Sequence, residues 1–447
     1  MKMAAKHVVS MTEGNITSQL MTVAWPLVIC DLIQQLYNTV DSYVLARFVG
    51  QDSFAALGVA ETFVNLFVFI LLGACTGISV ILATHFGGNN EKLFRRGLFL
   101  ALMAGGAVTL FFSVLGMFFT EWGLGLINTP AELMDESAAY LRIVCGGLIF
   151  CYIYNLGAAA LRAVGNTRVA AVILFGSLLV KSLLSYLLSV SVGWGISGAA
   201  IATVMTQLLA CTAFYAYGRT YLPMLLFSRE DMVFDRAELR KIFDYSSMTA
   251  LQQSSIQIGK VLIQGSINSL GAAGIAAYAA AARLESFVNT FSQSLAAAVS
   301  VFVAQNLGAK NPVRTKEGFK RGRSISVMCG AVTVAVMYGF APLGISWFID
   351  STAGDNAAMA AGVAYLRTIS FFYLICFWGA IYQGYLRGAG ILDIQYYGTT
   401  MQIASRVIIT WILIDTLGLE AVAWATGFGW VFITTYQLIY WYRHDLN

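Results

Sequence analysis

Ten ionisable side chains lie in stretches of this sequence that are otherwise apolar, and the chemistry of the protein is to be sought among them. A charged group at the centre of a lipid bilayer costs at least about 2.5–3.5 kcal/mol, so it is retained where it has a partner or a function. Long basic side chains near a helix end reach the interface instead, which is the alternative for Arg142 and Arg367. The ten are Asp31, Asp41, Glu61, Arg142, Lys181, Lys260, Arg283, Glu285, Arg367 and Arg406.

The sharpest pattern surrounds Asp41. Gln34, Asn38 and Asp41 are spaced i, i+4 and i+7, so a helix places them on one face as a polar stripe. A second stripe with a spacing of four residues contains Lys181 and Ser185. Both stripes are therefore treated as candidate functional sites.

Composition places the chain in a bilayer. Of its 447 residues, 58% are hydrophobic and 11% are charged, whereas soluble domains average about 25% charged residues. The seven cysteines all fall in apolar stretches, which is typical of packing residues rather than of disulfides or metal ligands. The sequence contains no G-x-x-x-x-G-K-[ST] nucleotide loop and no catalytic or metal-binding cluster. We therefore expect no enzyme, no metal, no cofactor and no nucleic-acid partner.

Twelve apolar segments are candidates for membrane-spanning helices, which need roughly 20 residues each. The predicted fold class is an all-α polytopic membrane protein with twelve transmembrane helices in two pseudo-symmetric six-helix bundles. We expect an N-terminal lobe over residues 1–217, a cytoplasmic inter-lobe linker over 218–241 and a C-terminal lobe over 242–447. The segments are 17–46, 53–82, 97–119, 137–160, 165–190, 196–217, 242–266, 273–303, 324–348, 360–385, 393–415 and 420–441.

Basic residues gather on one side of this topology. Twenty of the 27 lysines and arginines, Lys2 and Lys6 among them, lie at the termini, in the linker or in loops of that side. The opposite loops carry Arg47 and nine acidic residues, including Asp350 and Asp355. Because cytoplasmic loops are enriched in lysine and arginine, both termini are predicted to be cytoplasmic, in a cell membrane of the bacterial inner-membrane type.

The two halves of the sequence repeat one another. Several motifs recur at nearly constant offsets of 221 to 225 residues. Since each half has an even number of segments, we expect parallel repeats about an axis along the membrane normal, with a cavity near the midplane. The recurring pairs are Gly50 and Gly271, Ser79 and Ser300, Gly87 and Gly308, and the pentapeptides 161–165 (LRAVG) and 386–390 (LRGAG).

Taken in order, the motifs resemble those of the multidrug and toxic compound extrusion (MATE) family over nearly the whole chain. The resemblance implies twelve helices in two bundles, a central cavity, and export of bulky organic cations driven by inward flow of sodium or protons. The motifs that carry it are PL at 26–27, QQLYNTVDS at 34–42, RFVG at 47–50, the two LR-x-x-G pentapeptides, GAAIAT at 198–203 and QNLGA at 305–309.

The resemblance assigns Asp41 to a cation site in the N-terminal lobe. The family supplies an asparagine and an aspartate from helix five and a threonine from helix six, and Thr203 matches the threonine. Helix five departs from the pattern, because Lys181 stands at the asparagine position and Ser185 at the aspartate position. The residues predicted to couple transport to an ion are Asp41, Lys181, Asn38, Ser185, Thr203 and Gln34.

The lysine changes which ion the site suits. A sodium site needs several oxygen ligands and usually more than one negative charge, whereas here one carboxylate is missing and an ammonium is present. The simplest interpretation is that Lys181 pairs with Asp41 as a tethered cation that is able to exchange a proton. We therefore favour the proton over sodium as the coupling ion. The alternative is a fixed salt bridge that holds helices one and five together.

In the C-terminal half, the repeat places Arg406 opposite Lys181, and Glu285 is the expected neutraliser of the basic side chains. Aromatic residues suit the binding of flat or cationic solutes, although ordinary packing is the alternative for each. The residues predicted to line the substrate cavity are Tyr37, Tyr154, Lys260, Tyr278, Arg283, Glu285, Asn289 and Arg406.

These expectations describe a monomeric secondary active exporter of small organic solutes, cationic or amphiphilic and drug-like, that works by ion antiport and alternating access of two lobes. The alternative is a flippase or exporter of a lipid-linked or anionic metabolite, because Lys181, Lys260, Arg283 and Arg406 would attract phosphates. A membrane-embedded enzyme is disfavoured by the lack of a catalytic constellation.

Overall fold

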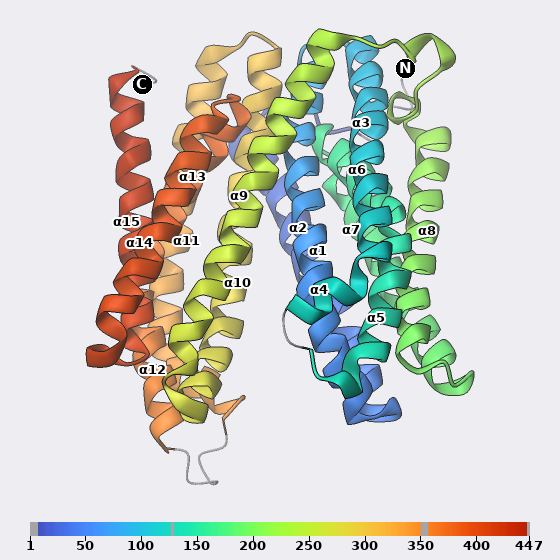
Figure 1. The fold of residues 1–447 in the computed structure, drawn as a ribbon. Helices are drawn as coiled ribbons and strands as arrows, with labels where there is room; N and C mark the ends of the chain where they lie inside the picture. Colours follow the sequence, from blue (N-terminus) through green and yellow to red (C-terminus); the bar gives the residue numbers. More distant parts are fainter. Residues whose placement is uncertain (1–7, 127–128, 350–355, 445–447) are drawn as a thin grey trace. The chain divides into compact units, whose positions relative to one another are not determined.

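The structure is a computed structural model that describes residues 8–126, 129–349 and 356–444. Within these residues the chain is helical and contains no β-strand (Figure 1). Lys2, Lys6, Asp350 and Asp355, which entered the prediction of topology, lie outside the described residues, and so does the side chain of Asn38.

The first half of the chain contains helices α1 to α8. α1 continues into a π-helical turn at Leu45–Val49, and α7 into another at Leu187–Ser191. The helices are α1 (Ile16–Val44), α2 (Gln51–Gly87), α3 (Glu91–Phe118), α4 (Thr120–Leu126), α5 (Ala131–Gly146), α6 (Leu148–Ala163), α7 (Thr167–Tyr186) and α8 (Gly195–Tyr221).

The second half contains helices α9 to α15, and two short 3-10 turns at Pro223–Leu225 and Arg229–Asp231 precede it. The helices are α9 (Arg236–Asn268), α10 (Gly271–Gly308), α11 (Pro312–Ser346), α12 (Asn356–Ser370), α13 (Tyr373–Gly388), α14 (Leu392–Leu417) and α15 (Glu420–Arg443).

Each of the twelve predicted segments coincides with one of these helices or with a bent pair, which confirms the all-α polytopic fold class. α5 and α6 form the fourth segment with a bend of 50°, and α12 and α13 form the tenth with a bend of 52°. Eight described helices are long and apolar enough to cross a membrane, and the bent pairs bring that number to ten. α9 and α15 correspond to the two remaining predicted segments and are not among these ten. α9 is the more polar because it begins in the charged linker and carries Gln252, Gln257 and Lys260.

Two compact units divide the chain. The first comprises Met1–Met11 and Trp25–Ala250, and the second comprises Thr12–Ala24 and Leu251–Asn447. The divisions therefore fall inside α1 and inside α9, whereas the predicted lobes end at residue 217 and begin at residue 242. The assignment of residues 218–241 as a cytoplasmic linker stays a prediction.

Equivalent positions of the two halves share unusual backbone conformations. Gly165 and Gly390 have φ angles of 75° and 77°. Asn89 and Lys310 have φ angles of 52° and 55°, and each stands directly before the asparagine that caps the next helix. Since positive φ is uncommon for residues other than glycine, its recurrence at the repeat spacing supports the duplication read from the sequence.

Small residues bring α2 close to the first part of α9. A Cβ atom added at Gly77 would lie 2.5 Å from the backbone oxygen of Tyr245, and one added at Gly73 would lie 2.7 Å from Ala250 Cα. Glycine at these positions removes the side chain that would otherwise separate the two backbones, a device common in membrane helix packing.

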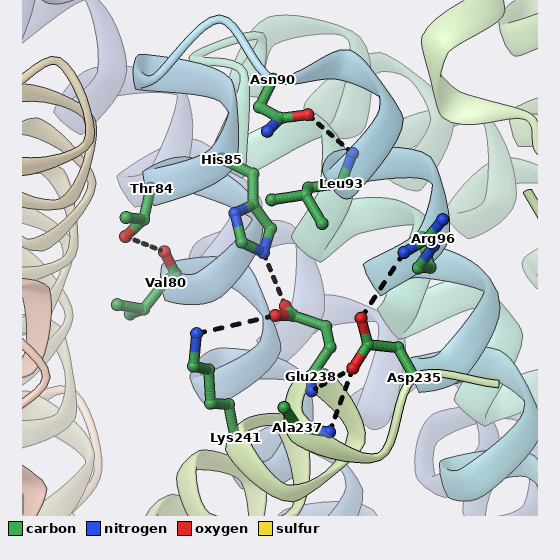
Figure 2. Close-up of polar contacts among 10 residues, drawn as sticks. All are labelled: Val80, Thr84, His85, Asn90, Leu93, Arg96, Asp235, Ala237, Glu238 and Lys241. Atoms are coloured by element: carbon green, nitrogen blue, oxygen red, sulfur yellow. Dashed lines mark hydrogen bonds and ion pairs between the residues drawn. The ribbon is translucent and has the colours of Figure 1, made fainter. Parts of the chain in front are cut away.

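A polar network ties the start of α9 to the adjoining ends of α2 and α3 (Figure 2). His85 Nε2 lies 2.6 Å from Glu238 Oε1, and Arg96 Nη1 lies 3.5 Å from Asp235 Oδ2. Asp235 Oδ1 accepts hydrogen bonds from the backbone N–H groups of Ala237 and Glu238 at 3.0 and 3.1 Å, so it caps α9. The N–H of Glu238, helped by that of Ala237 and by Arg96, lowers the pKa of Asp235 below its ordinary value. The network fixes where α9 begins.

Candidate functional site

Asp41 lies at the centre of a buried polar cluster in the first unit. Its Oδ2 atom lies 3.1 Å from Lys181 Nζ and accepts a hydrogen bond from Thr203 Oγ1 at 3.0 Å. Its Oδ1 atom accepts a hydrogen bond from Ser185 Oγ at 3.0 Å. All four side chains are buried, and only 2% of Asp41 and 3% of Lys181 is exposed. Four of the residues predicted to couple transport to an ion therefore meet at one point.

The ammonium of Lys181 has two further partners, both on Tyr37. Nζ donates a hydrogen bond to the Tyr37 carbonyl oxygen at 3.0 Å and lies 3.9 Å from the centroid of its ring. A buried charge needs such partners, because losing water costs several kcal/mol per ion, and the face of an aromatic ring attracts cations. The expected contact between Lys181 and Asp41 is present, and its role in coupling stays a prediction.

Two helical hairpins bring these residues to a similar distance from their turns. Asp41 lies nine residues before Gly50, where the chain turns from α1 into α2, and Glu61 lies eleven residues after it. With a rise of 1.5 Å per residue, both lie about 15 Å from the turn. Lys181 and Thr203 flank the turn between α7 and α8 in the same way.

A cavity of about 170 Å³ adjoins the ion pair, with walls from α1, α2, α5, α6, α7 and α8 of the first unit. Pockets for drug-sized ligands start at about 300 Å³, so this cavity suits a small solute or one group of a larger solute. The predicted residues that line it are Gln34, Tyr37, Asp41, Tyr154, Lys181 and Thr203.

Glu61 lines the same cavity, although the sequence analysis placed it among embedded charges and not in the site. It is partly buried and interacts electrostatically with Asp41 and Lys181. Tyr140, which the sequence analysis also missed, is a buried part of the wall. The signal for Glu61 was its position across the turn at Gly50 from Asp41.

The other predicted cavity residues lie in the second unit, where Glu285 is engaged by a phenol. Tyr365 Oη donates a hydrogen bond to Glu285 Oε2 at 2.8 Å, and the ring of Tyr278 packs edge-on against Tyr365 with centroids 6.0 Å apart. The Tyr278 and Arg406 side chains interact electrostatically. Cys376 Sγ lies 4.0 Å from Asn289 Oδ1.

Glu285 does not form the ion pair expected of it. Within the described residues, no ion pair joins Glu285 to Lys260, Arg283 or Arg406. Lys260 and Arg406 nevertheless interact electrostatically with Glu285 at longer range. The partner that the structure shows for this carboxylate is instead the hydroxyl of Tyr365 on α12. None of these residues lines the cavity of the first unit.

In the part of the chain that the structure describes, no group of three or more histidine, cysteine, aspartate or glutamate side chains could hold a metal ion. At Asp41 the ammonium of Lys181 takes the place that a metal cation would need, 3.1 Å from the carboxylate.

A duplicated, polytopic helical chain with a buried charge pair beside a cavity has an architecture expected of a membrane transporter. The MatE family model matches residues 26–187 and 249–412, which together make up most of the sequence. The chain belongs to this family. The model thus matches one stretch of similar length in each half, in agreement with the internal repeat.

Individual relatives agree with this assignment. The chain is 25% identical over 386 residues to the probable multidrug resistance protein YpnP of Bacillus subtilis, covering 85% of this chain and 84% of that protein. It is 26% identical over 293 residues to the FAD transporter of Shewanella oneidensis, covering 63% of each chain. Among solved structures, a MOP superfamily transporter from Pyrococcus furiosus, described as having a binding pocket of reverse polarity, has a TM-score of 0.89 at 18% identity, over 98% of this chain and 97% of that chain. This last likeness shows the shared fold.

Proposed function

We propose that the chain is a secondary active exporter of small organic cations, driven by inward movement of protons. The observation that carries the proposal is the buried Asp41–Lys181 pair beside a cavity with tyrosine and carboxylate walls. Relatives named as multidrug resistance proteins support the class of substrate. The proposal includes a monomer in the cell membrane with both termini cytoplasmic.

Protonation of Asp41 supplies the coupling step. Two unit charges 3.1 Å apart attract by about 5 kcal/mol at an effective dielectric constant of 20. A proton on the carboxylate removes that attraction and turns an acceptor into a donor, so the contact between α1 and α7 weakens. A cation arriving in the cavity favours the opposite state. Export and proton entry are thereby linked through one carboxylate.

Sodium is disfavoured as the coupling ion. The cluster offers one carboxylate and two hydroxyl oxygens, from Ser185 and Thr203, and both hydroxyls already donate to the carboxylate. Lys181 adds a positive charge at 3.1 Å. A metal cation would have to displace the ammonium and turn both hydroxyls around.

Proteoliposomes test the proposal. Purified protein is reconstituted, loaded with ethidium or tetraphenylphosphonium, and given a pH gradient or a sodium gradient of equal size. We expect efflux with the pH gradient that Asp41→Asn abolishes, and no efflux with sodium alone. Efflux that follows sodium, or that survives Asp41→Asn, contradicts the coupling scheme.

An anionic substrate is the second candidate. Lys260, Arg283 and Arg406 form no ion pairs within the described residues, and one relative is an FAD transporter. The same proteoliposomes loaded with FAD decide between the two. Efflux of FAD that Arg406→Gln slows would favour the anion.

A further inference from the structure

The first-unit cavity contains a carboxylate that the mechanism above does not use. Asp41 is occupied by an ammonium and two hydroxyls. Glu61, in contrast, lines the cavity and has no hydrogen bond or ion pair within the described residues. Among the described lining residues, Asp41, Glu61 and Lys181 are the acidic and basic ones, and with all three ionised the lining carries one net negative charge.

A second group points to the same ligand. Tyr37 is buried, with 7% of its surface exposed, and its hydroxyl has no hydrogen-bond partner among the described residues. A buried polar atom without a partner costs about 1–3 kcal/mol, so the Tyr37 hydroxyl is a further polar group beside the cavity whose hydrogen-bonding capacity the described residues leave unused. Tyr140 and Tyr154 add aromatic surface to the same wall.

We propose that Glu61 recognises the positive charge of the transported solute, and that the cavity takes a small organic cation or the ammonium head of a larger one. This inference rests on the proposed export of cations and adds the residue that binds them. Asp41 and Lys181 then serve coupling, while Glu61 serves recognition.

The geometry fits one small cation. A volume of about 170 Å³ is below the roughly 300 Å³ at which drug-sized pockets begin. Lys181 already lies over the ring of Tyr37, but Tyr140 and Tyr154 add two further aromatic rings to the wall, and aromatic rings attract quaternary ammonium groups. The hydroxyl of Tyr37 beside the cavity suits a solute with one polar group. Choline has both features and is the probe of choice.

Calorimetric titration of the purified full-length protein in detergent tests the inference. The ligands are choline and its neutral isostere, in which a tert-butyl group replaces the trimethylammonium. We expect choline to bind, the isostere to bind at least about tenfold more weakly, and Glu61→Gln to weaken choline to a similar degree. Equal affinity for both ligands, unchanged affinity in Glu61→Gln, or no binding of choline to the native protein overturns the proposal.

A variant in which the carboxylate is moved from position 61 to a neighbouring position distinguishes loss of the charge from misfolding. Asn65 lies one helical turn from Glu61 and lines the same cavity. The double variant Glu61→Gln/Asn65→Asp therefore returns a carboxylate to the wall and should regain much of the choline affinity. Glu132→Gln, which removes an exposed carboxylate outside the cavity, should leave the affinity unchanged. If the double variant has the same unfolding temperature as the native protein but does not regain choline binding, recognition of the cation by a carboxylate is contradicted.

The two proposals fail in different ways. Proton-driven efflux of tetraphenylphosphonium together with unchanged choline affinity in Glu61→Gln refutes only the role of Glu61. Choline binding that depends on Glu61 without any gradient-driven efflux refutes only the export mechanism. If Glu61→Gln stops proton-driven efflux but leaves choline affinity intact, Glu61 carries protons and the proposal is wrong.

Discussion

Deleting one charge of the Asp41–Lys181 pair should cost far more stability than deleting both. The charges lie 3.1 Å apart and their side chains are 2% and 4% exposed, so Lys181→Met leaves a carboxylate in a nearly dry site. Removing one partner of a buried pair costs about 3–5 kcal/mol. The hydroxyls of Ser185 and Thr203 still donate to Asp41, which places the cost at the lower end of that range.

The double variant isolates the coupling. Asp41→Asn/Lys181→Met has neither charge of the pair, so its free energy of unfolding should be about 2–3 kcal/mol higher than the sum of the two single losses predicts. Thermal unfolding of the native protein and the three variants in detergent, followed by tryptophan fluorescence, measures the difference.

An exposed ion pair provides the control. Arg142 and Glu121 are closer, at 2.6 Å, but their side chains are 48% and 65% exposed. Because exposed pairs contribute about 0–1 kcal/mol, Arg142→Met should barely change the unfolding temperature. Single variants whose losses simply add in the double variant, or a Lys181→Met protein as stable as the native one, would refute the reasoning.

Three further outcomes are expected. Lys181→Asn/Ser185→Asp restores the two-carboxylate pattern of the family and should make efflux depend on sodium, as measured in proteoliposomes with a sodium gradient. Gly77→Ala places a Cβ 2.5 Å from the Tyr245 oxygen and should cost about 1–3 kcal/mol by overpacking, seen in thermal unfolding. Asp235 stabilises the fold above its ordinary pKa of 3.8, and this contribution is lost as the pH falls through its lower folded pKa. Asp235→Asn should therefore lower stability at neutral pH and flatten its loss in acid, as measured by unfolding across a pH series.

Controls sharpen these tests. Gly58→Ala adds a Cβ with nothing within 4 Å, so it should leave the unfolding temperature unchanged where Gly77→Ala lowers it. Sodium-independent efflux in the Lys181→Asn/Ser185→Asp protein would show that oxygen ligands alone do not determine which ion is coupled to efflux. Because asparagine can still cap the helix, an Asp235→Asn protein with the native acid profile would show that the charge of Asp235 contributes nothing.

Much of the fold follows from local sequence. An apolar run of roughly 20 residues can be identified as a membrane-spanning helix from its own sequence, because its length and composition suit the bilayer whichever helix it packs against. The repeat could also be recognised from the sequence. Positive φ favours glycine, and glycine stands at both 165 and 390, where the backbone has nearly the same positive φ. The bends between α5 and α6 and between α12 and α13 were not predicted, because continuous hydrophobicity carries no signal for a change in direction.

The sequence alone also determined the buried pair in outline. Helical spacing placed Asp41 on a polar stripe, and the resemblance to the MATE family predicted that Lys181, Ser185 and Thr203 lie near it. Only the tertiary structure decided that Glu61 shares the cavity and that Glu285 accepts from a tyrosine rather than from a basic side chain. Periodicity fixes the face on which a side chain lies along its own helix, whereas the partner across a helix interface depends on how each helix is rotated and how far each side chain reaches.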